Sequence, residues 1–252
     1  MHILLTNDDG YNAPGIQELY RVLKTKTKHD VSIAAPEGQR SATGHSITLF
    51  TPLFVTEHSL EGPCKGFSIS GTPSDCVKLA IQGKLIPKPD LLISGINQGA
   101  NLGTDIFYSG TVSAAMEGVL LGVPSIAVSL ANFEYKDFGP SATYLADHLD
   151  LLLKLQHKGL MNLNFPGKPQ TQWRGLKVTR LGKAIYENIF EKRSDPRGRV
   201  YFWQSGNLIR DCEDDTDLTA IQDDFISVTP MHSDLTDFAS LQAWKDFFSD
   251  KL

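Results

Sequence analysis

Residues 90 to 130 read DLLISGINQGANLGTDIFYSGTVSAAMEGVLLGVPSIAVSL, and this stretch indicates the fold. Asp90 to Gly95 is a mostly apolar run that stops at a glycine, which is typical of a buried strand of a parallel sheet. Gly110 to Leu121 is rich in small residues and predicts a helix, and Ser125 to Leu130 predicts a second strand. A strand, a helix and a strand in this order predict a parallel sheet with helices packed on it.

The same alternation continues on both sides of this stretch. Apolar or alternating runs predict further strands, at residues 2–6, 31–35, 47–56, 66–70 and 160–165. Helical spacing of apolar residues predicts further helices, at residues 14–24, 75–82 and 141–155. We therefore expect an α/β protein whose sheet is covered on both faces and binds ligands beyond the carboxyl ends of its strands.

The pattern changes after about residue 170. Short apolar segments separated by polar stretches predict antiparallel strands in hairpins, at residues 176–181, 200–203 and 226–229. The intervening segments, 183–199 and 206–224, are expected to be long loops. We therefore divide the chain into a core at 1–170 and a C-terminal hairpin region at 171–252. Isolated hairpins need a surface to bury against, so this region is either an irregular part of the same core or an arm that reaches a neighbouring subunit.

Composition excludes several classes of partner. The chain has 252 residues, 41% of them hydrophobic, and a formal net charge of -5. This is enough apolar material for a sizeable core, and no basic excess points to a nucleic-acid polymer or an anionic membrane. No signal peptide is visible, and no uncharged apolar run is long enough to span a bilayer. We expect a cytoplasmic protein with no membrane partner.

A pair of carboxylates follows the first predicted strand directly, in the sequence Asn7-Asp8-Asp9-Gly10. Adjacent carboxylates repel each other, and the pKa of one rises unless a cation lies between them. Mg²⁺ or Mn²⁺ supplies such a charge and prefers oxygen ligands. Gly10 allows the backbone to turn sharply. Asn-Asp-Gly is also an ordinary turn sequence, and the motif alone favours a solvated turn. Its position at the end of the first strand makes a metal site about equally well supported.

The loop after the second predicted strand carries Arg40, Ser41 and His45. Arg40 could contact a phosphate bidentately, and the hydroxyl of Ser41 could bind a metal or a phosphate. His45 is more often an ordinary polar loop residue than a general acid. The chain has no GxSxG elbow, so this pattern does not favour a serine hydrolase.

A glycine-rich loop, SGINQGANLGT at 94–104, closes the strand at 90–95. Its backbone N–H groups can hold an oxyanion, and the side chain of Asn97 can bind a hard metal ion. The run Tyr108-Ser109-Gly110-Thr111 can cap the following helix, whose N-terminus would point its dipole at a phosphate. Neither a Walker loop nor a dinucleotide fingerprint is present.

Three strand ends therefore present oxygen-bearing side chains at one edge of the sheet. Together they form a suitable four-ligand site for one hard cation, with water completing an octahedron. The ligands in this prediction are Asp8, Asp9, Ser41 and Asn97.

Several motifs occur together and in order: ILLTNDDG at 3–10, AAPEGQRSATGHSIT at 34–48, GTPSDCVKLA at 71–80, the stretch from 90 to 118, and GVPSIAVS at 122–129. Looser matches follow, with DPRG at 195–198, DTD at 215–217 and SVTPMHSDLT at 227–236. Through these motifs the chain resembles the SurE survival-protein nucleotidases, densely over about its first half. SGIN-x-G-x-N and YSGTV beside NDDG make the resemblance specific.

The resemblance implies a Rossmann-like, three-layer α/β core with a C-terminal β-hairpin exchanged between subunits of a homodimer or homotetramer. It implies hydrolysis of nucleoside 5′- and 3′-monophosphates, and often of short polyphosphate. It also implies one Mg²⁺ or Mn²⁺ per subunit on the four ligands named above. The implied phosphate contacts are Asn101, Ser109, Gly110 and Thr111.

Two departures from the family pattern concern one loop. The family commonly has Ser-Gly where this chain has Ser41-Ala42, which could stiffen or shift the loop. The loop around His45 varies in composition within the family, so we assign that residue no role. Neither departure removes a type of ligand, and we expect the site to persist.

The predicted catalytic residues are Asp8 and Asp9. Our hypothesis is that a water activated by the bound cation attacks phosphorus in line, and the rival hypothesis makes one of these aspartates a covalent nucleophile. Two other classes remain as alternatives: a nucleotide- or sugar-phosphate transferase and a non-catalytic nucleotide-binding regulator. Trp173, Phe202 and Trp203 could stack on a base, but aromatic residues in strands more often belong to a core or an interface.

Overall fold

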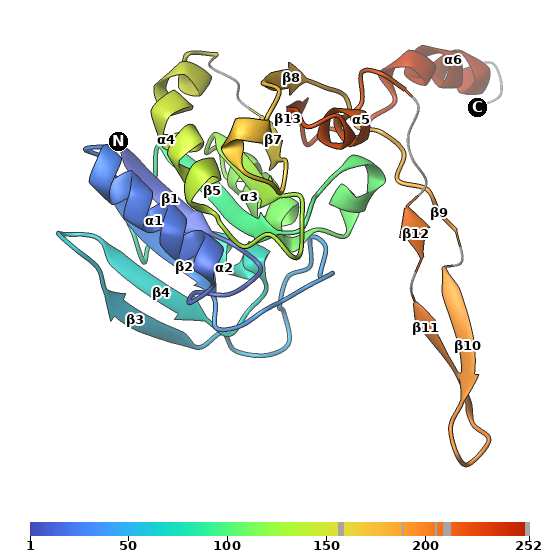
Figure 1. Cartoon of the computed structure of the whole chain (residues 1–252), viewed down its shortest axis with the longest axis horizontal. Coiled ribbons are helices and arrows are strands. Elements are labelled where there is room, and N and C mark those ends of the chain that lie inside the picture. Colours follow the sequence, from blue (N-terminus) through green and yellow to red (C-terminus); the bar gives the residue numbers. More distant parts are fainter. Residues whose placement is uncertain (156–158, 188, 205, 209–212, 250–252) are drawn as a thin grey trace.

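The computed structural model describes every residue except 156–158, 188, 205, 209–212 and 250–252. Its main feature is a nine-stranded sheet in the order β3-β4-β2-β1-β5-β6-β7-β13-β8 (Figure 1). The strands from β4 to β7 in this order are mutually parallel, whereas β3 and β13 run antiparallel to their neighbours β4 and β7. The strands are β1 (His2–Thr6), β2 (Asp30–Pro36), β3 (Val55–Ser59), β4 (Lys65–Ile69), β5 (Leu91–Gln98), β6 (Ser125–Leu130), β7 (Leu160–Phe165), β8 (Leu176–Val178) and β13 (Ile226–Met231).

Helices cover both faces of the parallel strands and make a three-layer fold. Strand residues alternate between the faces: Ile3 and Leu5 pack in the cluster that holds α1 and α4, and Leu4 packs in the cluster that holds α2 and α3. This burial on both faces explains why the parallel strands appear as continuous apolar runs. The helices are α1 (Pro14–Lys26), α2 (Pro73–Gln82), α3 (Gly110–Leu120), α4 (Gly139–Lys154), α5 (Asp217–Gln222) and α6 (Phe238–Ser249), with short 3₁₀ turns η1 (Gly103–Phe107) and η2 (Gln170–Gln172).

The predicted α/β class and most of its elements are confirmed, and one strand prediction is wrong. The strand expected at 47–56 begins only at Val55. The residues before it are held outside the sheet, because Asp75 accepts hydrogen bonds from the backbone N–H and the hydroxyl of Thr48 at 2.9 and 2.6 Å. Asp75 also completes a capping box with Thr72 at the start of α2. A polar anchor therefore overrides the strand pattern of this segment.

The hairpin prediction for the C-terminal region is only partly right. Val200–Gln204 does pair antiparallel, with the strand β10 (Phe190–Ser194), as β11. By contrast, β8 and β13 pair parallel with each other and extend the main sheet beyond β7. The segments expected to be long loops contain short elements, among them β10 and α5. The division of the chain at residue 170 stays a prediction.

An arm projects from the sheet in Figure 1. It consists of the β10–β11 pair and a second pair, β9 (Tyr186–Glu187) with β12 (Asn207–Leu208). All residues of β10 and β11 are exposed, and α6 has no buried residue. In the part of the chain that the structure describes, no helix has the length and apolar character needed to cross a membrane.

Candidate active site

The two carboxylates lie where β1 ends, at the carboxyl edge of the parallel strands. The turn that carries them is closed by Asn7, whose Nδ2 donates to Gly10 O at 2.9 Å and whose Oδ1 accepts from Gly10 N at 3.1 Å. Gly10 has a φ of +107°, and a Cβ there would meet Gly38 at 3.0 Å, so only glycine suits this turn. The motif is thus a built turn that holds Asp8 buried and Asp9 partly buried.

The N-terminus of α3 packs directly on Asp8. A Cβ placed on Gly110 would lie 2.7 Å from Asp8 Cβ. The hydroxyl of Thr111 donates to Asp8 Oδ1 at 2.6 Å. Ser109 caps the helix, since its Oγ accepts from the backbone N–H of Val112 at 3.1 Å. The first turn of α3 and the carboxylate of Asp8 therefore form one site.

Both carboxylates are held where their charge is unfavourable. Burial, assisted by the neighbouring Asp9, raises the pKa of Asp8 to about 6, and the hydrogen bond from Thr111 offsets part of this rise. Burial also raises the pKa of Asp9, against a hydrogen bond from Gln98 N–H. Among the residues that the structure describes, neither forms an ion pair with Lys, Arg or His. Within the described part of the chain the pair has no positive counter-charge, and a hard cation fits that need.

Strand β5 brings Asn97 toward this pair through an irregularity. The register between β5 and β6 shifts between Ser94 and Asn97. Gly95 permits the shift, because its φ is +144° and a Cβ would lie 2.3 Å from Val128 O. Asn97 Nδ2 donates to Gly99 O at 2.8 Å, which leaves its side-chain oxygen as the atom suited to a metal. The next residue, Gln98, donates its backbone N–H to Asp9 Oδ2 at 3.3 Å.

The loop with Ser41 is tied to the same edge at two points. The backbone N–H of Arg40 donates to Asp8 O at 2.7 Å, and that of Gly44 donates to Tyr108 O at 3.1 Å. Ser41 lies between these anchors and is exposed. Its predicted role as a metal ligand stays a prediction. The side chain of Arg40 donates to Ser70 O at 3.1 Å.

His45 continues this loop onto the side of α3. Its Nε2 lies 2.8 Å from Glu117 Oε2, and Lys78 Nζ lies 3.1 Å from Glu117 Oε1. The hydrogen bond with His45 and the contacts of Lys78 lower the pKa of Glu117, against a rise from burial. The sequence pattern assigned no role to His45. In the structure, its contact with Glu117 holds the loop against α3.

Asn101 is buried and hydrogen-bonded to the sheet. Its Nδ2 donates to Ser129 Oγ at 2.7 Å, and its backbone N–H donates to Asn164 Oδ1 at 2.8 Å. Its carbonyl accepts from the side chains of Asn162 and Asn164. These contacts position the glycine-rich loop, and a phosphate contact by Asn101 stays a prediction.

Sequence reasoning missed two parts of this support. Asn162 and Asn164 alternate within the apolar strand β7, and polar residues with a period of two in such a strand were the available signal. Asp217 ends the DTD motif at 215–217, which carried the resemblance but gave this residue no role. Its buried carboxylate accepts from the backbone N–H of Gly103 at 2.8 Å and of Gly182 at 2.9 Å, and so ties the C-terminal region to the glycine-rich loop.

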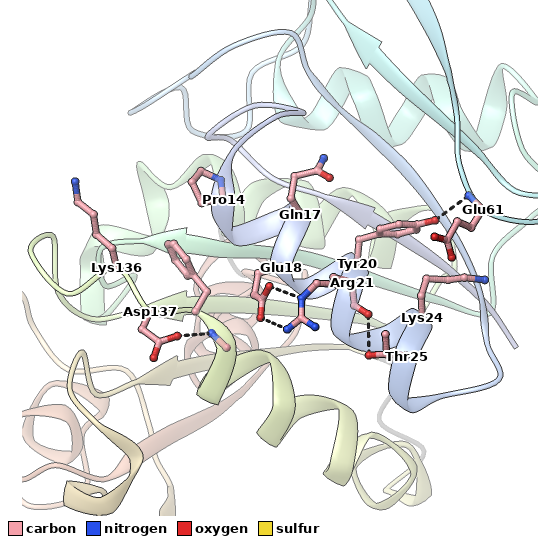
Figure 2. A pocket seen from close by; sticks show the side chains of 12 residues that line it. Pro14, Gln17, Glu18, Tyr20, Arg21, Lys24, Thr25, Glu61, Lys136 and Asp137 are labelled. Carbon is pink, nitrogen blue, oxygen red and sulfur yellow. Dashed lines mark hydrogen bonds and ion pairs between the residues drawn. The ribbon is translucent and has the colours of Figure 1, made fainter.

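A groove of about 660 Å³ lies away from these residues, along the outer side of α1 and beside residues 136–139. Figure 2 shows Arg21 paired with Glu18 and the Tyr20 hydroxyl accepting from Glu61 N–H. None of the predicted site residues lines it. The predicted site residues therefore lie outside this groove.

The family model described as survival protein SurE matches residues 3–188. The chain belongs to the SurE family. The 5′-nucleotidase SurE of Desulfitobacterium hafniense (strain DSM 10664 / DCB-2) is 59% identical over 99% of this chain and 98% of its own length. The 5′-nucleotidase SurE of Natranaerobius thermophilus is 45% identical over 97% and 99%. The resemblance predicted from the motifs is confirmed.

The SurE fold is also found in a solved structure. The SurE protein from Aquifex aeolicus matches with a TM-score of 0.84 and 38% sequence identity, over 98% of this chain and 100% of that chain. The predicted Rossmann-like, parallel-rich fold with a C-terminal hairpin is therefore confirmed. In this SurE-family chain, residues of the NDDG, SGIN and YSGT motifs lie together at the carboxyl edge of the parallel strands.

Proposed function

We propose that this chain is a phosphomonoesterase that hydrolyses nucleoside 5′-monophosphates to nucleoside and phosphate. The observation that carries the proposal is the packing of a helix N-terminus on the buried carboxylate of Asp8, next to Asp9, with Gly110 against Asp8 and Thr111 bonded to it. Such an arrangement suits a phosphate that is held together with a cation. The names of the relatives, 5′-nucleotidase SurE, support nucleotides as the substrates.

The first turn of α3 is the proposed phosphate cradle. The N–H groups that open a helix have no partner within it and favour an anion. Ser109 uses its oxygen to accept from Val112 N–H, so its hydroxyl hydrogen can be donated to a phosphoryl oxygen. The hydroxyl of Thr111 is already donated to Asp8, so this residue would offer its backbone N–H instead. Gly110 lets the helix approach Asp8 closely enough for both groups to reach one phosphate.

The donor set fits one divalent cation per subunit, Mg²⁺ or Mn²⁺. Asp8, Asp9, the hydroxyl of Ser41 and the side-chain oxygen of Asn97 would hold it, and all four are the hard oxygen ligands that these ions prefer. Among the described residues no three His, Cys, Asp or Glu side chains form a metal-type cluster, which agrees with a set containing only two carboxylates. When bound, such a cation supplies Lewis-acid polarisation of a phosphoryl oxygen.

The same phosphate end is present in other substrates. Nucleoside 3′-monophosphates and short polyphosphate carry a terminal phosphate that the α3 cradle would hold equally, and we extend the proposal to both. A transferase or a non-catalytic nucleotide-binding regulator on this fold remains the alternative class. Two adjacent carboxylates weaken phosphate binding unless a cation is present, which favours the metal-dependent enzyme over a simple binding protein.

We also propose a homodimer or homotetramer assembled through the C-terminal region. The β10–β11 pair exposes Phe190, Val200, Tyr201, Phe202 and Trp203, and α6 exposes Phe238, Leu241, Trp244 and Phe248. Apolar surface gathered on an extended arm marks an interaction site, and a two-stranded pair is marginal without a partner surface. A second copy of the chain is the occupant that the predicted exchange requires.

Phosphate release from a panel of 5′- and 3′-nucleoside monophosphates tests the function. It is measured with Mg²⁺, with Mn²⁺ and with EDTA, for the wild type and for Asp9→Asn. We expect metal-dependent release that falls by at least about 10²-fold in the variant. Asp150→Asn on α4, exposed and remote from the site, is the matched control and should behave like wild type.

A second readout separates metal binding from turnover. Mn²⁺ should raise the thermal midpoint of the wild type, because a ligand of the folded state stabilises it, and should not do so in Asp9→Asn. No phosphate release by folded wild type with either metal would reject the enzyme in favour of a binding protein or a transferase. A metal-induced shift that survives Asp9→Asn would instead remove this residue from the ligand set.

A further inference from the structure

An aromatic side chain borders the proposed phosphate site without belonging to the core. Phe133 follows β6 and is 76% exposed. Its ring lies on Gly99: a Cβ built on this glycine would be 2.7 Å from ring atoms Cε1 and Cζ. Gly99 in turn accepts the hydrogen bond from Asn97 Nδ2. The ring therefore sits beside the proposed cation ligand, with most of its surface turned to solvent.

The backbone that carries this ring is held from two sides. Gln98 Nε2 donates to Phe133 O at 2.6 Å, and the same Gln98 donates its backbone N–H to Asp9 Oδ2 at 3.3 Å. On the other side, Asn132 Oδ1 accepts the N–H groups of the second and third residues after it, at 2.7 and 3.3 Å. Its Nδ2 donates to Gly167 O at 3.1 Å. An Asx-type turn thus fixes the backbone that carries the ring, which lowers the entropy cost of binding on it.

Other aromatic residues fit a base less well. Trp173 packs among the core aromatics, with its ring 5.4 Å from that of Phe165. Phe202 and Trp203 lie on the projecting arm. Tyr108 is exposed, and its carbonyl accepts the backbone N–H of Gly44. Of these aromatic residues, only Phe133 is linked to the carboxylate pair by hydrogen bonds, because Gln98 donates both to its carbonyl and to Asp9.

We infer that Phe133 is the stacking platform for the nucleobase of the substrate. The inference rests on the proposed function, because it takes a nucleotide whose phosphate lies at the N-terminus of α3, beside the carboxylates. Such a phosphate leaves the base outside the polar site, where an exposed ring beside Gly99 offers its face. Stacking of a base on an aromatic ring is tolerant of base identity, since every base has a π-face. The chain would thus prefer nucleotides to other phosphate esters without selecting one base.

The test compares a substrate with a base and one without. Steady-state kinetics are measured for adenosine 5′-monophosphate and for ribose 5-phosphate, with Phe133→Ala, Phe133→Leu, Phe133→Tyr and Tyr108→Ala beside the wild type. For adenosine 5′-monophosphate, we expect Phe133→Ala and Phe133→Leu to raise KM by about tenfold with little change in kcat, as loss of one stacking contact predicts. Phe133→Tyr should retain the wild-type KM, and ribose 5-phosphate should be hydrolysed equally by all Phe133 variants.

Each other outcome speaks against the inference in a distinct way. Equal losses on both substrates would mean that Phe133 only supports the Gly99 loop. Unchanged kinetics in Phe133→Ala, or a base-dependent loss in Tyr108→Ala alone, would remove the platform from Phe133. Absence of phosphate release from either substrate by the wild type would instead reject the proposed function. In that case, calorimetric binding of adenosine 5′-monophosphate to wild type and to Phe133→Ala would still show whether the ring contributes to nucleotide affinity.

Discussion

Replacing Gly110 with alanine should disable the active site while leaving the chain folded. The new Cβ would lie 2.7 Å from Asp8 Cβ and 2.9 Å from its Oδ2, whereas ordinary contact begins at 3.4 Å. Relief therefore requires a movement of about 0.7 Å (3.4 − 2.7) between the start of α3 and the carboxylate. Alanine is otherwise favourable in a helix, so we expect the substitution to act mainly by changing the geometry of the contact with Asp8.

The size of the loss follows from that displacement. A misplacement of about 1 Å can cost about 10²-fold in rate, so we expect kcat/KM for a nucleoside monophosphate to fall by about 10- to 100-fold. Overpacking costs about 1–3 kcal/mol, which is less than the stability of an ordinary domain. Circular dichroism and a thermal melt would check that Gly110→Ala is folded.

A matched control lies in the loop after β2. Gly38→Ala adds the same methyl group where nothing lies within 4 Å, so its kcat/KM should match wild type within about twofold. If folded Gly110→Ala kept the wild-type kcat/KM, the close packing of α3 on Asp8 would not be needed for catalysis. That result would refute the prediction.

Three further predictions concern the surroundings of the site. Thr111→Val removes the hydroxyl donated to Asp8 and should lower kcat/KM by about tenfold, the effect of one hydrogen bond to a charged group; a variant as active as wild type would contradict this. His45 lowers the pKa of Glu117 below its ordinary 4.5. The ionised carboxylate therefore stabilises the folded state above pH 4.5, and this stabilisation is lost as the pH falls through the folded-state pKa. Glu117→Gln should therefore unfold in urea with a free energy about 1–2 kcal/mol lower than wild type at pH 7, and the gap should narrow at pH 4. Trp203→Glu places a charge on the apolar arm and should shift the mass in light scattering toward the monomer, whereas an unchanged mass would exclude this face from assembly.

The structure also explains why the glycine-rich loop has a defined shape. Its residues do not rely on local turn geometry alone. Asn101 is bonded to β6 and β7 through Ser129, Asn162 and Asn164, and Asp217 holds Gly103 from the C-terminal region. A buried polar network of this kind favours one conformation of the loop. The glycine-rich loop is thereby connected to β6, to β7 and to α5 of the C-terminal region.

The sequence by itself determined the α/β class, the family and the identity of the carboxylate pair. Apolar runs of the right length, such as those at 90–95 and 125–130, specify buried strands because hydrophobic burial depends on local pattern. Asp8 and Asp9 could be named because they follow the first strand directly, and strand ends meet at one edge of a parallel sheet. These inferences depend only on residues that are close together in the sequence.

Only the tertiary structure decided which distant groups meet. Thr111 donates to Asp8 across 103 positions, and Gly103 to Asp217 across 114. The parallel pairing of β8 with β13 was missed for the same reason, since apolar periodicity marks a strand without naming its partner or direction. Such contacts depend on register, helix placement and long-range packing, and no local pattern of residues encodes them.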